Sequence, residues 1–556
     1  MKSALIGLFL LCVTLVSVRP LLYSGFFPMH DDTQVGRVVV MGRAVRNGQF
    51  PVRWVTDLGY GYGYPLFNFY GPLPYYVGGA LYAAGLSGLT ATKLMFALGI
   101  IGAGLTMFLF VQYLFGNLAG LVAAVAYVYA PYHAVEIYVR GAVGEFWMFM
   151  FLPIIFLGLV MASKNFRFGG VVVGSMGLAG VILSHTIMGY ITTLGLALGI
   201  GMYGLAVLLF GKGSMVTFRN YVLLLLFGLG LTMFFWLPAF FEMGFTSVAG
   251  QIGTTAFWGD HFVCLGQLWQ SDWGFGGSVP GCIEGMSFKL GKVHLLLGAL
   301  GGIALIVFSK RVSLKTRIIF RTVFFLFVCS IILMTPLSGR VWQIVPEASF
   351  IQYPWRMLVF SVFGLSVFAG ASVVLVQKQW MRGIFVLIAV LGIVGVNGKL
   401  FEPQYGYTRD PAAFETDEEL RFRVSKISDE YLPPSVTKPG AAGEIPKTTV
   451  KTPNNGSVET EIDTETYTKA MITVREQEMV TINRAHFPGW RYYIEGKEIE
   501  PALDHGLPTI VLPAGTYLFQ SRFTDTPVRI VGNVVSLLSI LYSIFLFSRH
   551  EKKAIT

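Results

Sequence analysis

Long apolar runs recur along almost the whole sequence, and they limit what the chain can fold into. A run of about 20 apolar residues matches an α-helix that crosses a bilayer. The sequence therefore predicts a mainly α-helical, polytopic membrane protein with about 12 transmembrane helices. The runs lie near 3–23, 91–113, 117–132, 144–162, 168–186, 188–210, 219–240, 292–309, 317–335, 356–376, 382–399 and 527–547.

The composition agrees with this class and excludes others. Of the 556 residues, 54% are hydrophobic and only 13% are charged, whereas a soluble domain is about 25% charged. The net charge of +10 fits Lys and Arg in short cytoplasmic loops. No basic segment is long enough or sufficiently interleaved with aromatic residues to indicate a nucleic-acid partner.

The basic residues predict the orientation. They gather in alternate connections, which read "SKNFR", "GKGSMVTFR", "SKRVSLKTR", "QKQWMR" and the tail "RHEKK". Such connections face the cytoplasm, so both termini are expected there. The longer, mixed-charge segments then face outward: 24–90, 133–143, 241–291, 336–355 and 400–526.

Three parts are expected along the chain. Residues 1–400 form the transmembrane module with the outward loop 24–90, in which 55–90 is a turn-rich interfacial strip with a short amphipathic helix. Residues 401–526 form an extracytoplasmic domain, which is β-rich from about 445 because Thr and Val alternate there. Residues 527–556 carry the last transmembrane helix and a basic cytoplasmic tail.

Two of the four cysteines flank a polar outward loop. Cys264 and Cys282 enclose "CLGQLWQSDWGFGGSVPGC". If this loop faces an oxidising compartment, the two are disulfide candidates, and the bridge would contribute about 3 kcal/mol in the chain-entropy view.

Ionisable groups at the outward ends of the spans are the candidate functional residues, because such groups are costly near a bilayer. A carboxylate beside an apolar wall loses solvation, and its pKa rises toward the range of a general base. Guanidinium groups bind phosphate through paired hydrogen bonds. The candidates are Asp31 and Asp32 as bases, with His30, Arg140, Glu145, His185, Tyr353, Trp355 and Arg356 as substrate-binding groups.

Structural alternatives stand beside each of these roles. Asp31 and Asp32 could be solvated residues or could cap a helix, and His185 could be a packing residue. Arg140 and Glu145 could form a structural ion pair. Arg356 and Trp355 could anchor helices at the membrane interface. The spacings match no common metal motif. A divalent cation, Mg or Mn, held by Asp31 and Asp32 is therefore left open, and no cofactor is certain.

Several stretches resemble known families. A first helix, an outward loop with an acidic pair and aromatic interfacial segments resemble the GT-C class of membrane glycosyltransferases. The stretches "HDDTQ", "GQFPVRWVTDLGYGYGYPLFNFYGPLPYY", "YVRGAVGEFW", "LSHTIMGY", "IQYPWRML", "EYLP" and "FPGWRYYIEGK" are similar to the bacterial 6-pyruvoyl-tetrahydropterin-synthase-related and YfhO-like membrane proteins.

The resemblance implies a transferase of the bacterial cytoplasmic membrane that takes sugar from a polyprenyl-phosphate-linked donor. Asp31 or Asp32 would be the catalytic carboxylate, and Arg140 and Arg356 would hold the lipid phosphate. The acceptor would be an extracytoplasmic glycan, lipid or protein. The aromatic residues of "GWRYY" in the outer domain are candidates for stacking on a glycan.

Two other functions compete with this hypothesis. A transporter or flippase for lipid-linked saccharides would use the same lipids, but such folds often carry internal repeats and polar groups at the midplane. We find no repeat, and the polar residues gather at the outer face. A non-catalytic scaffold of envelope assembly would not need the acids at all.

Overall fold

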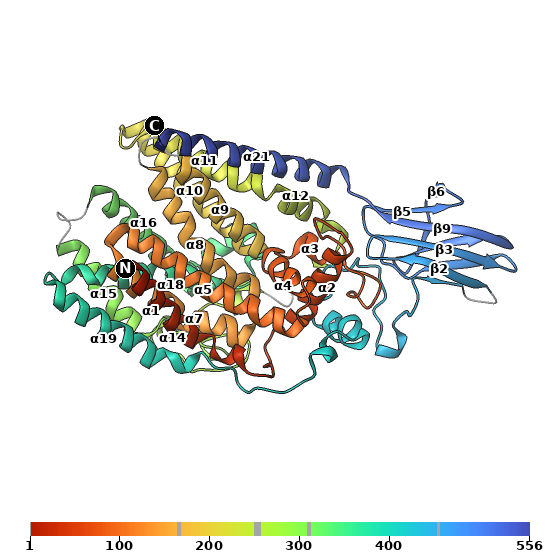
Figure 1. Cartoon of the computed structure of the whole chain (residues 1–556), viewed down its shortest axis with the longest axis horizontal. Helices are drawn as coiled ribbons and strands as arrows, with labels where there is room; N and C mark the ends of the chain where they lie inside the picture. Colours follow the sequence, from red (N-terminus) through yellow and green to blue (C-terminus); the bar gives the residue numbers. More distant parts are fainter. Residues whose placement is uncertain (1, 164–167, 249–256, 308–312, 453–455, 556) are drawn as a thin grey trace.

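The computed structural model describes residues 2–163, 168–248, 257–307, 313–452 and 456–555. Helices form a long body, and the β-strands lie together at one end of it (Figure 1). The two chain termini lie toward the opposite end of the body (Figure 1). The last helix, α21 (Pro527–Ile555), runs from the strands back along the body.

Seven helices of the described chain are long and apolar enough to cross a membrane. This makes the chain a multi-pass membrane protein. They are α5 (Gly88–Phe115), α8 (Val143–Ala162), α10 (Thr186–Phe210), α16 (Leu314–Met334), α18 (Leu358–Ala371, in the span Pro354–Leu375), α19 (Gln379–Asn397) and α21.

The other five predicted runs also coincide with apolar helices, but not with full-length straight spans. Two are bent pairs: α6 (Asn117–Val128) meets Pro131–Arg140 at 47°, and α11 (Met215–Leu231) meets Met233–Phe245 at 69°. Three are shorter helices: α1 (Lys2–Ser17), α9 (Phe168–Ser184) and α15 (Lys292–Val307). Up to nine spans result if each bent pair is one, so twelve spans are not confirmed.

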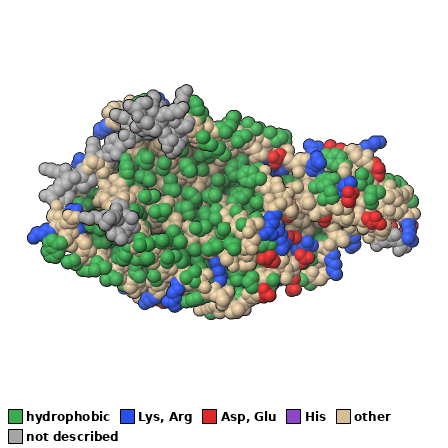
Figure 2. Space-filling view, in the orientation of Figure 1, with side chains coloured by type: hydrophobic (Ala, Val, Ile, Leu, Met, Phe, Trp, Pro, Cys, Tyr) green, Lys and Arg blue, Asp and Glu red, His purple; other side chains and the backbone are tan. Residues whose placement is uncertain are grey.

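The outer surface of the helical body is apolar. Leu198 is 70% exposed, Ile306 78% and Leu391 61%. Figure 2 shows hydrophobic side chains covering the body, whereas Asp and Glu appear only toward the end that carries the strands. Water would not tolerate so broad an apolar face, but lipid solvates it.

Short helices connect and cover the spans, most of them at the end of the body nearest the strands. They are α2 (Gln34–Arg46), α3 (Leu66–Phe69), α4 (Leu73–Ala83), α7 (Pro131–Ala134), α12 (Met233–Glu242), α14 (Leu265–Trp269), α17 (Gly339–Ile344) and α20 (Ser425–Ile427). Helices α2 and α4 pack tightly, because a Cβ at Gly42 would lie 2.7 Å from the Gly79 carbonyl oxygen. The segment 24–90 is therefore a packed helical unit, and it contains the short helix expected within 55–90.

The strands form two antiparallel sheets. Their orders are β1-β4-β8-β7 and β2-β3-β9-β5-β6. The strands are β1 (Val450–Lys451), β2 (Ser457–Asp463), β3 (Tyr467–Val474), β4 (Glu478–Ile482), β5 (Trp490–Ile494), β6 (Lys497–Ile499), β7 (Ala502–Asp504), β8 (Leu507–Leu512) and β9 (Gly515–Phe523).

The aromatic stretch "GWRYY" contributes a tryptophan to the packed core. Trp490 is only 6% exposed. Its ring meets Trp54 at 5.5 Å and Phe523 at 5.2 Å, and Arg484 lies 4.5 Å from its centroid. Trp490, Arg491 and Tyr492 also line a surface cavity, so stacking of this stretch on a glycan stays a prediction.

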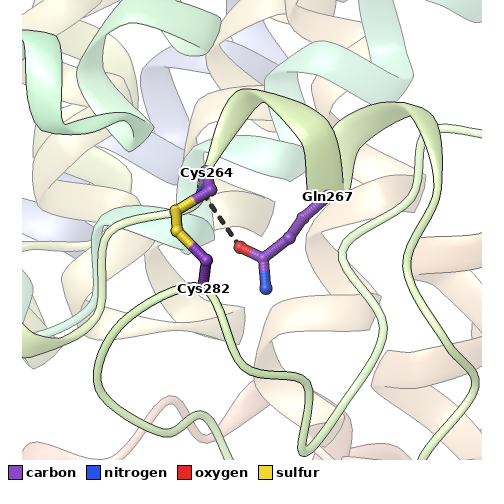
Figure 3. Close-up of a disulfide and its surroundings, with 3 residues drawn as sticks. All are labelled: Cys264, Gln267 and Cys282. Atoms are coloured by element: carbon purple, nitrogen blue, oxygen red, sulfur yellow. Dashed lines mark hydrogen bonds between the residues drawn. A yellow bond between two sulfur atoms is a disulfide. The ribbon is translucent and has the colours of Figure 1, made fainter.

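Cys264 and Cys282 form a disulfide, with Cα atoms 5.6 Å apart (Figure 3). The Gln267 side chain accepts a hydrogen bond from the Cys264 backbone N–H at 2.9 Å (Figure 3). Within the closed loop, the Phe275 carbonyl lies 3.1 Å from His30 Nε2. The bridged loop therefore packs against the start of the 24–90 unit.

A buried ionic network joins the β region, the last helix and the 24–90 unit. Glu242 is 3% exposed and accepts hydrogen bonds from Arg529 at 2.8 Å and from Asn68 at 2.8 Å. Asn68 accepts in turn from Arg53 at 3.0 Å. Arg529 also donates to the Pro488 carbonyl at 2.9 Å, so the network fixes the strands to the helical body.

We expect Glu242→Ala to lower the free energy of unfolding by about 3–5 kcal/mol, because it leaves the buried Arg529 without its carboxylate partner. Thermal unfolding in detergent measures the effect. Glu461→Ala is the control, since Glu461 is 57% exposed and pairs with Lys469 at the surface; its effect should stay within about 0.5 kcal/mol. Equal shifts for the two variants would contradict a stabilising network.

Candidate functional site

The acidic start of the 24–90 unit is hydrogen-bonded to a second outer loop. The backbone N–H groups of His30 and Asp31 donate to the carbonyls of residues 139 and 140 at 3.2 and 3.0 Å. The Gln34 side chain donates to the next carbonyl, that of residue 141, at 2.8 Å. Three consecutive carbonyls thus hold the segment that carries Asp31.

Gly141 makes this approach possible. Its φ is +65°, a left-handed conformation that favours glycine. A Cβ there would lie 2.1 Å from Met29 Sδ. Any larger residue would push the segment that precedes Asp31 off the loop.

Directly beside this contact lies a buried cluster of two arginines and two glutamates. Arg140 Nη1 lies 3.0 Å from Glu145 Oε2 and also pairs with Glu136. Arg356 Nε lies 3.6 Å from the same Glu145 oxygen. Both glutamate side chains are fully buried. The structural ion pair expected for Arg140 and Glu145 therefore exists, and it belongs to a larger set.

Two aromatic rings cover the cations. The Arg140 guanidinium lies 4.3 Å from the Trp355 centroid, and that of Arg356 lies 5.1 Å from the Tyr353 centroid. The two rings stack at 5.0 Å. Trp355 is only 3% exposed, so it is a wall of this cluster rather than an interfacial belt residue.

His185 has a structural role and also lies near the cluster. It precedes α10, and its Nδ1 accepts from the Met188 N–H at 3.2 Å. It interacts electrostatically with Glu145 and Arg356. Gly144 allows this closeness, because a Cβ there would lie 3.2 Å from the His185 ring.

The two neighbouring aspartates face different surroundings. Asp31 interacts electrostatically with Arg140 and with Tyr70. Asp32 instead interacts with Glu419 and Arg409, which belong to the outer region. The arginine cluster thus interacts with Asp31, whereas the charged neighbours of Asp32 belong to the segment 401–526.

Several titratable side chains of this region are partly buried. They are Tyr70, His185, Glu430 and Tyr431. They come from the 24–90 unit, the start of α10 and the first part of the outer region, and so converge from distant parts of the sequence.

Arg37 and Glu430 were not singled out by the sequence. Arg37 is 4% exposed, lies 4.2 Å from the Tyr70 centroid and donates to Ser428 at 2.7 Å. Arg37 is one of several arginines in α2, and only the fold reveals its partners. The stretch "EYLP", which begins with Glu430, contributed to the family resemblance, but the sequence indicated no function for it.

The residues at the acidic pair do not form a metal-ligand set. Within the described residues, no group of three or more His, Cys, Asp or Glu side chains is arranged to hold a metal ion. Asp31 and Asp32 also face different neighbours.

No protein-family model matches the chain, and no curated protein matches it. Several solved structures resemble it, including the following three, each at 14% identity. Arabinofuranosyltransferase AftD from Mycobacteria has a TM-score of 0.46 and is matched over 74% of this chain and 28% of its own. The oligosaccharyltransferase AglB from Archaeoglobus fulgidus, in complex with an inhibitory peptide and a dolichol-phosphate, has 0.43, with 74% and 56% covered.

ArnT from Cupriavidus metallidurans, bound to undecaprenyl phosphate, has a TM-score of 0.36, with 70% of this chain and 63% of its own covered. The chain thus spans less than two thirds of each of these three proteins. With TM-scores below 0.5, these likenesses do not decide the function, and the side chains of the site carry the argument.

Burial and the nearby Glu419 carboxylate raise the pKa of Asp32. The folded state then holds the proton to higher pH than the unfolded chain, so stability falls as pH rises between the two pKa values. Asp32→Asn removes this penalty. We expect the variant to be more stable than the wild type near neutral pH, and to match it below the usual Asp pKa of about 3.9.

Thermal unfolding at the two pH values measures this difference. Asp504→Asn is the control, because the Asp504 side chain is 56% exposed, and it should behave alike at both. An Asp32→Asn effect that is independent of pH would show that Asp32 is solvated.

Proposed function

We propose that the protein is a membrane glycosyltransferase of the GT-C type. It transfers sugar from a polyprenyl-phosphate-linked donor to an extracytoplasmic glycan, lipid or protein. One observation carries the proposal: the Asp31 backbone is hydrogen-bonded to the carbonyl of Arg140, and the Arg140 guanidinium shares Glu145 with Arg356, where apolar helices end. A carboxylate and cations at this place meet the needs of transfer from a lipid phosphate.

Asp31 is the general base of this mechanism. It takes the proton from the acceptor hydroxyl while that oxygen attacks the anomeric carbon. The bond from the anomeric carbon to the phosphate oxygen breaks, and the lipid phosphate leaves with the electron pair. A single displacement of this kind inverts the anomeric configuration.

Arg356 is better placed than Arg140 to bind the lipid phosphate. Arg140 already pairs with two buried glutamates. Arg356 has one carboxylate at 3.6 Å, and its Nε has no hydrogen-bond partner among the described residues. Arg356 therefore contacts the phosphate. Arg140, Glu145 and His185 are positioning residues, and Tyr353 and Trp355 shield the cluster from water.

The remaining parts of the proposal follow the sequence. Residues 1–400 are the transferase module, 401–526 the extracytoplasmic domain, and 527–556 the last helix with the basic tail. Both termini lie in the cytoplasm of a bacterial cell. The quoted motifs group the chain with the 6-pyruvoyl-tetrahydropterin-synthase-related and YfhO-like membrane proteins.

Asp31→Asn should reduce transfer by about 10²–10⁴-fold, the usual contribution of a general base. The measurement follows labelled sugar leaving a polyprenyl phosphate donor in membranes that contain equal amounts of protein. Asp32→Asn should lose much less, because the charged neighbours of Asp32 belong to the segment 401–526. Asp504→Asn should be unaffected.

Unchanged transfer in Asp31→Asn would remove the mechanism. A flippase would instead move labelled lipid across the membrane without consuming the donor, and a scaffold would leave the donor untouched. The same membranes distinguish these results.

Arg356→Lys should raise the donor KM about tenfold, because an ammonium cannot replace a bidentate guanidinium at a phosphate. Kinetics with varied donor concentration measure it. Arg475→Lys, at an exposed position, is the matched control. A change in kcat with an unaltered KM would show that Arg356 does not bind the donor.

A further inference from the structure

Glu430 is a second carboxyl group close to the 24–90 unit, although it lies some 400 residues after Asp31 in the sequence. Its two carboxylate oxygens lie 3.1 and 3.0 Å from Ser428 Oγ. Ser428 Oγ accepts from Arg37 at 2.7 Å. A polar chain thus runs from Arg37 through Ser428 to Glu430.

Arg37 and the ring of Tyr70 connect this chain to Asp31. The Arg37 guanidinium lies 4.2 Å from the Tyr70 centroid. Tyr70 interacts electrostatically with both Asp31 and Glu430. The ring of Tyr75 lies 5.8 Å from that of Tyr70, and its hydroxyl donates to Gln34, which donates to the carbonyl of residue 141. Arg37 and Tyr70 are thus connected to the segment that carries Asp31.

Arg37 still has an unused donor. It is 4% exposed, and its Nε has no hydrogen-bond partner among the residues that the structure describes. A buried donor without a partner is costly. Such a donor next to accessible carboxyl and phenol groups indicates a place for a polar ligand.

The segment that carries Glu430 is anchored on both sides. The Tyr431 N–H donates to Tyr64 at 3.1 Å, and Tyr60 donates to Asp429 at 2.9 Å. The Leu432 carbonyl accepts from the Ser247 N–H at 2.9 Å. The residues on both sides of Glu430 are therefore held by neighbours, and Ser428 holds the carboxyl group itself.

We propose that Glu430, Ser428 and Arg37 form the subsite that binds the hydroxyl groups of the donor's sugar ring. The inference rests on the proposed function and deepens it. It names a subsite contributed jointly by α2 and by the first part of the outer region, and it makes these residues determinants of the transferred sugar.

The place of the phosphate favours the donor sugar over the acceptor. Tyr431 interacts electrostatically with both Arg356 and Arg37, and it directly follows Glu430. A phosphate at Arg356 would thus put its attached ring against the neighbouring carboxyl. Carboxyl, hydroxyl and guanidinium groups beside the aromatic rings of Tyr70 and Tyr431 suit the hydroxyl-rich surface of a sugar.

Two probes separate the sugar from the phosphate: polyprenyl phosphate and a polyprenyl-phosphate-linked hexose. Binding of each labelled probe to the full-length protein in nanodiscs gives two dissociation constants. Glu430→Gln should weaken the hexose-linked probe about tenfold and leave polyprenyl phosphate unchanged. Ser428→Ala should act in the same direction. Glu444→Gln, an exposed change in the outer region, should alter neither.

Each other result has a distinct meaning. If both variants bind both probes as the wild type does, the proposed subsite is wrong. If both probes bind more weakly by the same factor, Glu430 and Ser428 act in folding or in phosphate binding, and the proposed subsite is also wrong. Transfer that is lost while binding of both probes is unchanged assigns the residues to the acceptor instead. If Arg356→Lys weakens neither probe, the proposed function itself fails.

Discussion

Three hydrogen bonds from the segment 30–34 to the carbonyls of residues 139–141 hold the candidate site together. These bonds join the first outward unit to a loop more than 100 residues away. They place Asp31 beside Arg140 instead of in open water. Gly141 is part of the same constraint, because the approach of Met29 leaves no room for a side chain.

The arginine cluster is stable in this place because its charges cancel. Arg140 and Arg356 share Glu145, and Arg140 also pairs with Glu136. Removal of one member would leave a buried charge without a partner. The two arginines and two glutamates together carry no net charge. A phosphate that enters therefore meets no excess of negative charge from the glutamates. The loop closed by the disulfide contacts His30 through the Phe275 carbonyl.

Much of the helical part could be predicted from hydrophobic length alone, since each apolar run coincides with an apolar helix. The number of spans could not be predicted in this way, because the helices bend near Pro131 and Thr232. The length of a hydrophobic run does not reveal such a bend. Pro131 lacks a backbone donor and breaks the helix at the first bend, whereas the second bend at Thr232 has no proline at the break.

The sequence also indicated Asp31, Arg140, Glu145, His185 and Arg356 as outward ionisable groups, and the fold brings them near one another. It could not separate Asp31 from Asp32, because their neighbours come from different distant segments. Arg37 and Glu430 were missed for the same reason: neither sits at the end of a hydrophobic run. Trp355 is buried because Tyr353 and Arg140 pack against it. Its position near the end of a hydrophobic run predicts an interfacial residue and does not reveal these contacts.

The most direct test is an electron cryomicroscopy map of the protein in nanodiscs with polyprenyl phosphate. We expect density for the phosphate against Arg356, with the Asp31 carboxylate facing it from the docked 24–90 unit. A phosphate bound elsewhere, or Asp31 pointing into bulk water away from both arginines, would contradict the account.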